Sequence, residues 1–347
     1  NEIMRIKFLY SLSACLLIFC SCLGQKTASN ENSIWDNMLV YQLPNGGWSK
    51  HYTNGTAVDY NKKLSKDILK IIPKEERLAT IDNKATTQEI EALAEGFQKT
   101  SKKEYKQAVI RGINYLLSAQ YDNGGFPQYF PDTKGYRSQI TFNDNAMINV
   151  LELLRNVAKA EDVYDFIPDD LSEKAQRAVQ KGVECILKAQ VRVENELTVW
   201  AAQYDENLRP AQARKFEPVS LAASESVGIV RFLMKEEPTD EIVKAIESAI
   251  SWFNKVKIQG FRYETSSDAK GKIVRRLVPD DEAVVWSRFY EIGTNKPVFG
   301  DRDDTVHYNL DEISEERKNG YSWYGEWPVN LLKNNYPKWL KSINSKK

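Results

Sequence analysis

A repeated nonapeptide constrains the fold of this chain more than any other feature of the sequence. Residues 112–120 read GINYLLSAQ and residues 182–190 read GVECILKAQ, so the two copies lie 70 residues apart. A weaker third copy covers residues 245–256. Apolar residues recur at helical spacing through each copy, and an aromatic-rich loop follows it. Because such a unit buries its apolar face only against a neighbouring unit, the repeat predicts stacked helical pairs, in an open solenoid or a closed toroid.

The helical periodicity extends along most of the chain. Helices are expected over residues 90–97, 103–120, 141–160, 172–190, 221–234, 239–256, 310–317 and 327–343. Thr86 and Glu89 have the spacing of a capping box that opens the first of these helices. Short strands separated by turn residues are expected at 261–264, 273–278, 286–292 and 297–300. Because the long loops lie on one rim of the repeat, we expect a mainly α fold, a partly closed (α/α) toroid with short β-hairpins near residues 259–300.

The first 24 residues have the pattern of a signal peptide. Arg5 and Lys7 precede an apolar run over residues 8–23, which is shorter than the ~20 residues of a membrane span. Cleavage after Gly24 and acylation of Cys22, as in a bacterial lipoprotein, are the two alternatives. Residues 25–33 are polar and are expected to be a tether, and residues 34–347 a single catalytic domain.

The mature protein is therefore expected to be exported from a bacterium, as a secreted, periplasmic or outer-membrane lipoprotein. Removal of the signal leaves Cys185 as the one thiol, so no intramolecular disulfide is expected. We expect a monomer without a stable membrane span.

Composition excludes several classes of function. Lys+Arg and Asp+Glu both number 48, and a chain without a basic excess is not expected to bind nucleic acid. The only histidines are His51 and His307, which excludes a zinc site built on several histidines. No G-x-S-x-G motif accompanies them, which argues against a Ser-His-Asp hydrolase.

Three arginines stand out in the C-terminal part of the chain. Arg288, Arg302 and Arg317 lie at intervals of 14 and 15 residues in a tract rich in Trp, Tyr and Gly. Guanidinium groups bind carboxylates as bidentate forks, so the trio indicates a carboxylated or polyanionic ligand. The alternative is that each arginine pairs with a nearby acidic residue, Glu291, Asp301 or Glu315, on a solvated face.

Two carboxylates occur where repeated loops meet helices. Asp144 lies between Asn143 and Asn145, and Asp205 follows the segment WAAQY. In a toroid both can face one cleft, and their oxygens suit Ca²⁺. The alternative is that Asp144 merely stabilises a helix start, because Thr141 three residues earlier completes a capping-box spacing.

Several short segments, in this order, carry a resemblance to a known family. They are NGGWSK (45–50), TIDN (80–83), NYLLSAQYDNGGFPQ (114–128), ITFNDNAM (140–147), WAAQYD (200–205), FEP (216–218) and the arginine tract 286–325. In these segments the sequence resembles the pectate lyases of polysaccharide lyase family 10. The resemblance implies a helical toroid with a wide cleft. It also implies calcium-dependent β-elimination of α-1,4-polygalacturonate, which leaves a 4,5-unsaturated galacturonate end.

The resemblance also assigns roles to residues. Arg302 matches the family's catalytic arginine, and Asp144 and Asp205 match its calcium ligands. Substrate binding is expected at Asn145, Arg214, Arg288 and Arg317. Because arginine is normally protonated, a base role for Arg302 requires neighbouring cations that favour its neutral form, and an alkaline optimum would follow.

Two other functions stay open at this point. A helical-toroid glycosidase would use paired carboxylates and would not need calcium. A non-catalytic glycan-binding surface lipoprotein would bind pectin through the same aromatic residues and arginines.

Overall fold

Three helical pairs form the main body of the protein. The computed structural model describes residues 33–345, so the expected signal peptide and nearly all of the tether lie outside the described residues. After a helix over residues 33–41, the pairs are α3 (Thr87–Thr100) with α4 (Lys103–Ala119), α5 (Ala146–Lys159) with α6 (Asp169–Ala189), and α7 (Ala223–Leu233) with α8 (Asp240–Val256). The two helices of each pair contact each other.

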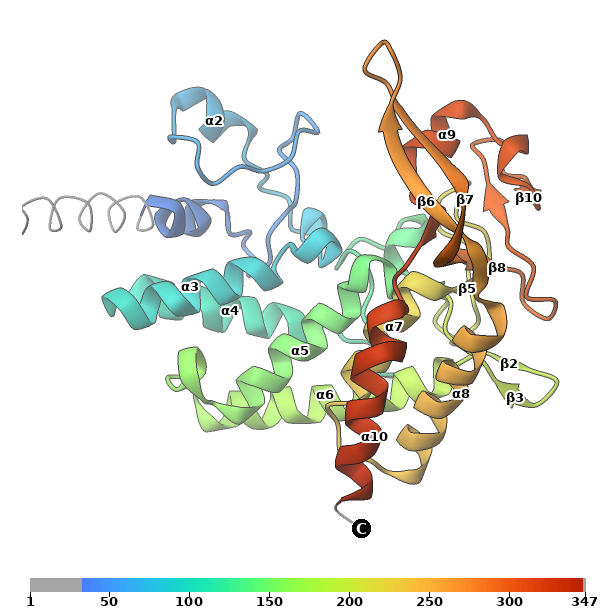
Figure 1. Ribbon diagram of the computed structural model, residues 1–347. Helices are drawn as coiled ribbons and strands as arrows, with labels where there is room; N and C mark the ends of the chain where they lie inside the picture. Colours follow the sequence, from blue (N-terminus) through green and yellow to red (C-terminus); the bar gives the residue numbers. More distant parts are fainter. Residues whose placement is uncertain (1–32, 346–347) are drawn as a thin grey trace, which may run out of the picture.

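The pairs are stacked so that their helices form two layers. In one layer α3 contacts α5 and α5 contacts α7, while in the other α4 contacts α6 and α6 contacts α8. Figure 1 shows the pairs following one another from cyan to orange. The helices are thus paired and stacked, and closure of the stack into a toroid stays a prediction.

The repeated glutamine explains why the copies resemble each other. Gln120 donates from Nε2 to the carbonyl oxygen of Ala178 on α6, at 2.8 Å, and Gln190 donates to that of Ala245 on α8, at 3.0 Å. Gln42, at the end of the helix over 33–41, makes the same contact to α4 at 2.9 Å. Each glutamine also donates to a carbonyl in the loop that follows it. The copies share this spacing because each glutamine makes an equivalent side-chain hydrogen bond between successive units.

The repeated glycine is needed where the two layers touch. A Cβ atom on Gly112 would lie 2.6 Å from the Ile90 side chain of α3, and one on Gly182 would lie 2.4 Å from Leu151 of α5. Real Cβ atoms do not approach side chains so closely, so glycine lets α4 pack directly on α3 and α6 directly on α5.

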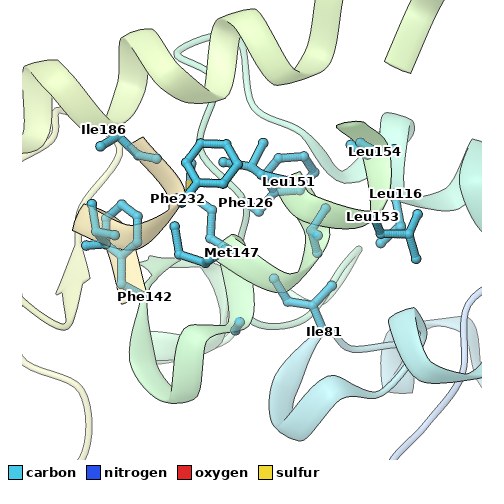
Figure 2. Close-up of a cluster of buried hydrophobic side chains, with 14 of the residues drawn as sticks. Ile81, Leu116, Phe126, Phe142, Met147, Leu151, Leu153, Leu154, Ile186 and Phe232 are labelled. Carbon is cyan, nitrogen blue, oxygen red and sulfur yellow. The ribbon is translucent and has the colours of Figure 1, made fainter. Parts of the chain in front are cut away.

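A large hydrophobic core lies between the layers. Figure 2 shows its centre, where Phe126, Met147, Leu151 and Phe232 meet. Three fully buried tryptophans, Trp48, Trp200 and Trp286, each donate the indole N–H to a carbonyl of a preceding helix, at 2.7–2.9 Å. Cys185 is buried here as a free thiol, and burial raises its pKa to about 12.

Short strands connect the helical units, and one long hairpin rises from them (Figure 1). The antiparallel pairs are β1 (Ile140–Thr141) with β4 (Gln203–Tyr204), β2 (Arg192–Val193) with β3 (Glu196–Leu197), β5 (Leu221–Ala222) with β8 (Phe289–Tyr290), β9 (Phe299–Gly300) with β10 (Val306–His307), and β6 (Ile258–Ser267) with β7 (Ile273–Ser287), which also pairs with β11 (Tyr324–Gly325). The hairpin is longer than the sequence predicts, because cross-strand backbone pairing continues through its exposed positions.

The capping box expected at Thr86 and Glu89 does not form. The hydroxyl of Thr86 donates to the Thr80 carbonyl at 2.8 Å and accepts from the backbone N–H of Trp48, so it does not cap α3.

The remaining helices are α2 (Lys66–Ile71), α9 (Glu315–Gly320) and α10 (Tyr336–Asn344), and a π-helical turn, η7 (Leu331–Asn335), precedes α10. Within residues 33–345, no helix is both long and apolar enough to cross a bilayer.

Candidate active site

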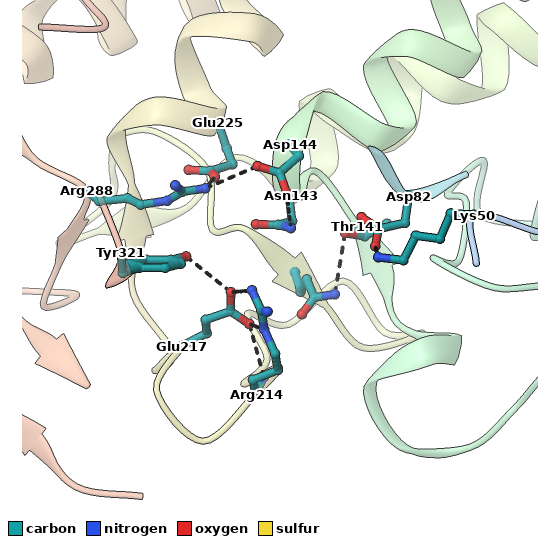
Figure 3. A network of polar contacts seen from close by, with 11 residues as sticks. Lys50, Asp82, Thr141, Asn143, Asp144, Arg214, Glu217, Glu225, Arg288 and Tyr321 are labelled. Atoms are coloured by element: carbon teal, nitrogen blue, oxygen red, sulfur yellow. Dashed lines mark hydrogen bonds and ion pairs between the residues drawn. The ribbon is translucent and has the colours of Figure 1, made fainter. Parts of the chain in front are cut away.

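A polar hollow lies where the loops enter α3 and α5. It has a volume of about 110 Å³, and Lys50, Asp82, Asp144, Arg214 and Glu217 contribute to its lining. Figure 3 shows these side chains pointing toward one another from segments far apart in the sequence. The hollow is therefore assembled by the fold rather than by one motif.

Two similar turns place its carboxylates. The turns are η2 (Asp82–Lys84) before α3 and η4 (Asn143–Asn145) before α5, and they contact each other. In each turn the middle residue has left-handed backbone, with φ 51° at Asn83 and φ 50° at Asp144. Asn and Asp adopt this conformation more readily than other residues with a side chain, which explains their use here. The pairing of the turns brings Asp82 and Asp144 to one hollow.

Each of these carboxylates has a cation beside it. Lys50 Nζ forms an ion pair with Asp82, and Arg288 Nη2 lies 3.6 Å from Asp144 Oδ1. Asp144 does not act as a helix cap: the N-cap of α5 is Asn145, and no side-chain hydrogen bond caps that helix. The capping explanation for Asp144 is therefore wrong.

The four arginines singled out from the sequence converge on two aromatic rings. The guanidinium carbons of Arg214, Arg302 and Arg317 lie 4.6, 5.6 and 4.4 Å from the centre of the Phe216 ring. That of Arg288 lies 4.9 Å from the Tyr321 ring, and the two rings are 5.7 Å apart. A concentration of guanidinium groups around aromatic faces suits a carboxylated sugar.

These arginines have carboxylate partners other than those expected. Arg288 pairs with Glu225, which is buried in the first turn of α7, and Arg302 and Arg317 share Glu316. The expected partner Glu291 accepts hydrogen bonds from Thr294 and Tyr308 instead. Asp301 accepts from Ser314, and Glu315 accepts from Asn319.

Glu217 fixes Arg214 within the hollow. Arg214 Nε donates to Glu217 Oε2 at 2.9 Å, and the Tyr321 hydroxyl donates to Glu217 Oε1 at 3.1 Å. The hydrogen bonds from Arg214 to Glu217 raise the pKa of the guanidinium. Glu217 thus holds Arg214 in one orientation, and Tyr321 in turn fixes Glu217.

Arg302, the residue that matches the family's catalytic arginine, lies outside the lining of this hollow. Its side chain is 62% exposed, and Nε donates to Glu316 Oε2 at 2.8 Å. The hydrogen bond with Glu316 raises the pKa of Arg302, and the neighbouring cation Arg214, which favours the neutral form as expected, only partly opposes that rise.

Asp205 lies in a different hollow from Asp144, beside Tyr121 and Asp122. Its carboxylate accepts hydrogen bonds from the backbone N–H groups of Asn207 and Arg209, at 2.9 Å each, and from Arg209 Nε at 2.8 Å. Partial burial opposes ionisation, but these bonds outweigh it and hold the pKa of Asp205 below its ordinary value. The structure therefore does not bring the two expected calcium ligands into one hollow.

Four residues of the site were not singled out from the sequence: Lys50, Asp82, Glu217 and Glu225. A signal for one of them was present, since the segment IDN at 81–83 and the segment FND at 142–144 share an apolar residue followed by two Asx residues. Lys50 and Glu217 lie in the segments NGGWSK and FEP, which carry the family resemblance, but no role was assigned to them, and Glu225 lies in none of those segments. Asn145, expected to bind substrate, borders a larger hollow on the other side of the Asp144 turn.

The comparison with protein families identifies the family of this chain. The family model described as pectic acid lyase matches residues 42–332, which includes every residue of the hollow. The chain belongs to the pectic acid lyase family. This confirms the resemblance, and the protein is a polysaccharide lyase.

Two solved structures of a polysaccharide lyase agree with the family. A family 10 polysaccharide lyase from Cellvibrio cellulosa is 35% identical with a TM-score of 0.78, over 88% of this chain and 91% of that one. An Asp-to-Ala mutant of the Cellvibrio lyase, in complex with trigalacturonic acid, has the same identity and TM-score over 88% of this chain and 92% of that one. The comparison with curated proteins gives no match.

Proposed function

We propose that this pectic acid lyase cleaves α-1,4-polygalacturonate by calcium-dependent β-elimination and leaves a 4,5-unsaturated galacturonate end. The observation that carries the proposal is the hollow itself, where the carboxylates of Asp82 and Asp144 lie with the cations Lys50 and Arg214, and where Arg288 approaches Asp144 from outside the lining. The complex of a similar lyase with trigalacturonic acid supports the choice of substrate. We also propose that the enzyme is exported and that the stacked pairs form part of a toroid.

The residues of the hollow fit a calcium ion that the substrate completes. Asp144 offers an exposed carboxylate, and Asp82 offers a buried one that would exchange its partner Lys50 for the ion. Asn83 and Asn143 line the same hollow. Oxygen is the ligand atom Ca²⁺ prefers, but it takes six to eight of them. No group of three or more His, Cys, Asp or Glu side chains suited to a metal occurs among residues 33–345. We therefore assign the ion to Asp82 and Asp144 in place of Asp144 and Asp205, with substrate carboxylates and water as the other ligands.

The reaction removes the C5 proton, which lies α to the uronate carboxylate. When bound, calcium would withdraw charge from that carboxylate and make the C5 proton easier to remove. Arg288 and Lys50 are placed to stabilise the negative charge that develops on the carboxylate as the proton leaves. The C4–O bond then breaks, and the leaving oxygen takes a proton as the new chain end.

The base must reach the hollow, which favours Arg214 over Arg302. Arg214 lines the hollow and is oriented by Glu217, whereas Arg302 is exposed outside the lining and is better placed to bind substrate with Arg317. Because Glu217 raises the pKa of Arg214, its neutral form is rare near neutral pH, and we expect an alkaline optimum.

One assay separates the proposal from its alternatives. Polygalacturonate is incubated with the enzyme, with and without a calcium chelator, and followed by ultraviolet absorbance of the unsaturated end and by reducing ends. We expect both signals to rise together and to stop with the chelator. Reducing ends without absorbance would indicate a glycosidase, and binding without either signal would indicate a non-catalytic glycan-binding protein.

A further inference from the structure

A second and larger hollow lies on the other side of the Asp144 turn. It has a volume of about 600 Å³ and is bordered by α5, α7 and α10. Ligand pockets in proteins commonly have volumes of about 300–1,000 Å³. The π-helical turn η7, which leads into α10, contacts α7, and in Figure 1 α10 is drawn in front of α7. None of the side chains discussed as catalytic lines it.

The hollow carries more positive than negative charge. Its lining includes the cations Arg231, Lys235 and Lys338, but only one carboxylate, Glu152, which pairs with Lys235 at 2.6 Å. Arg231 is half-buried, and its Nε donates to the neutral Asn335 Oδ1 at 3.1 Å. Neither Arg231 nor Lys338 has an acidic partner within ion-pair distance among the described residues. A half-buried guanidinium without a counter-charge favours an anionic ligand.

Neutral groups in the hollow point to a sugar rather than a simple anion. The amide Nδ2 of Asn149 is buried and has no hydrogen-bond partner in the described part of the chain. Ile148, Met234 and Trp339 add apolar surface, and the Trp339 ring is stacked with Tyr336 at 6.0 Å between ring centres. Amides for hydroxyl groups, apolar surface for C–H faces and cations for a carboxylate together match an acidic sugar.

The turn before α5 separates this hollow from the candidate active site. Asp144 lines the smaller hollow and Asn145, the next residue, lines the larger one. Asn145 has φ 60°, and its side chain lies so close to Gly228 that a Cβ there would be 1.9 Å from Asn145 Oδ1. Gly228 thus allows α5 and α7 to approach where the two hollows adjoin.

We propose that the hollow between α5, α7 and α10 is an accessory site for a galacturonate-containing oligosaccharide, with Arg231 and Lys338 binding its carboxylates. The choice of galacturonate rests on the proposed function, while the preference for an acidic sugar rests on the hollow alone. The site binds without chemistry, so it does not require calcium.

The test is a calorimetric titration with trigalacturonate in the presence of a chelator. The double variant Arg231→Gln/Lys338→Gln is compared with the control Arg177→Gln/Lys341→Gln, which removes two exposed cations that do not line the hollow. We expect the first to weaken binding about tenfold or more and the control to leave it unchanged, because each lost charged hydrogen bond weakens binding substantially. Arg231→Lys should retain most of the affinity, since the charge is kept.

Two further measurements keep the result interpretable. Turnover of polygalacturonate by the double variant should stay within about twofold of wild type, because neither residue lies in the catalytic hollow. Galactotriose, which lacks carboxylates, should bind weakly. The inference is overturned by an absence of chelator-resistant binding, by equal affinity in both double variants, or by equal binding of galactotriose. An absence of lyase activity in the wild type would instead refute the proposed function. The calorimetric result would still test the accessory site, because it measures binding without turnover.

Discussion

Glu225 and Arg288 form an ion pair in which the side chains are 1% and 11% exposed, and the same Arg288 nitrogen lies 3.6 Å from Asp144, whose side chain is 47% exposed. Arg288 is thus shared between a buried carboxylate that holds it and an exposed carboxylate that faces the hollow. Because Glu225 is the closer partner, Asp144 is left available to a cation. Burial raises the pKa of Glu225, and Arg288 opposes that rise.

Replacement of Glu225 by Gln should raise the calcium requirement of the enzyme. Without the buried carboxylate, Arg288 is expected to pair with Asp144 and compete with the cation. We expect kcat/KM to fall about tenfold or more at low calcium and to recover partly at high calcium. Loss of one partner of a buried pair also destabilises a protein by about 3–5 kcal/mol, so thermal unfolding is measured first. Glu173→Gln, in an exposed pair with Arg177, is the control; an unaltered calcium requirement in Glu225→Gln would count against this role.

Replacement of Asp144 by Asn separates a ligand from a structural residue. Asn tolerates the left-handed backbone of this turn as well as Asp does, and no capping bond is lost. We therefore expect an unchanged melting temperature and a fall in turnover of about tenfold or more, partly reversed by added calcium. Native turnover in this variant would show that the carboxylate is not needed.

Lysine substitutions at Arg214 and Arg302 test which arginine acts as the base. Lysine keeps the charge but loses the planar fork. For Arg214→Lys we expect kcat to fall about 100-fold or more with little change in KM, and calcium should not restore it. For Arg302→Lys we expect mainly a higher KM. The reverse pattern in steady-state kinetics would return the base role to Arg302.

Glu89 should make the stability of the protein depend on pH. The side chain is 1% exposed, and burial raises its pKa above the ordinary value of 4.5 despite hydrogen bonds from Tyr60 and Gln88. Between the ordinary pKa of Glu89 and its raised pKa in the folded protein, the folded state binds more protons than the unfolded state. The free energy of unfolding therefore falls as pH rises through this range. Glu89→Gln removes this titration. Melting temperatures measured upward from about pH 4 should fall less steeply in the variant than in wild type; parallel curves would contradict the assignment.

The repeat made much of the fold predictable. Gln120 and Gln190 occupy equivalent places because each follows one helix of the α4, α6, α8 layer and donates to the next, so a 70-residue sequence period reflects a structural period. Helix interiors followed the apolar spacing closely, as in the predicted helix 103–120 and the observed α4 (Lys103–Ala119). Periodicity is reliable where a helix packs on its neighbours along its whole length.

The site was only partly predictable, because its charges are paired through the fold. Nothing near Arg288 in the sequence indicates that Glu225, 63 residues away, is its buried partner. The left-handed turn at Asn83 places Asp82 beside the Asp144 turn, and this depends on contact between two turns rather than on a local pattern. The C-terminal helix covers nearly the expected residues, 329–344, but it contains a π-helical turn just before Pro337, where the proline lacks the N–H that a regular α-helix needs.

The most direct test of the account is the calcium concentration that gives half-maximal formation of the unsaturated product, measured for Asp82→Asn and Asp205→Asn. Asp82 lines the hollow with Asp144, whereas Asp205 lies in another hollow and is held by Arg209. We expect Asp82→Asn to raise that concentration about tenfold or more and Asp205→Asn to leave it close to the wild-type value. A normal calcium response in Asp82→Asn, together with a weakened one in Asp205→Asn, would contradict the assignment of the cation to this hollow.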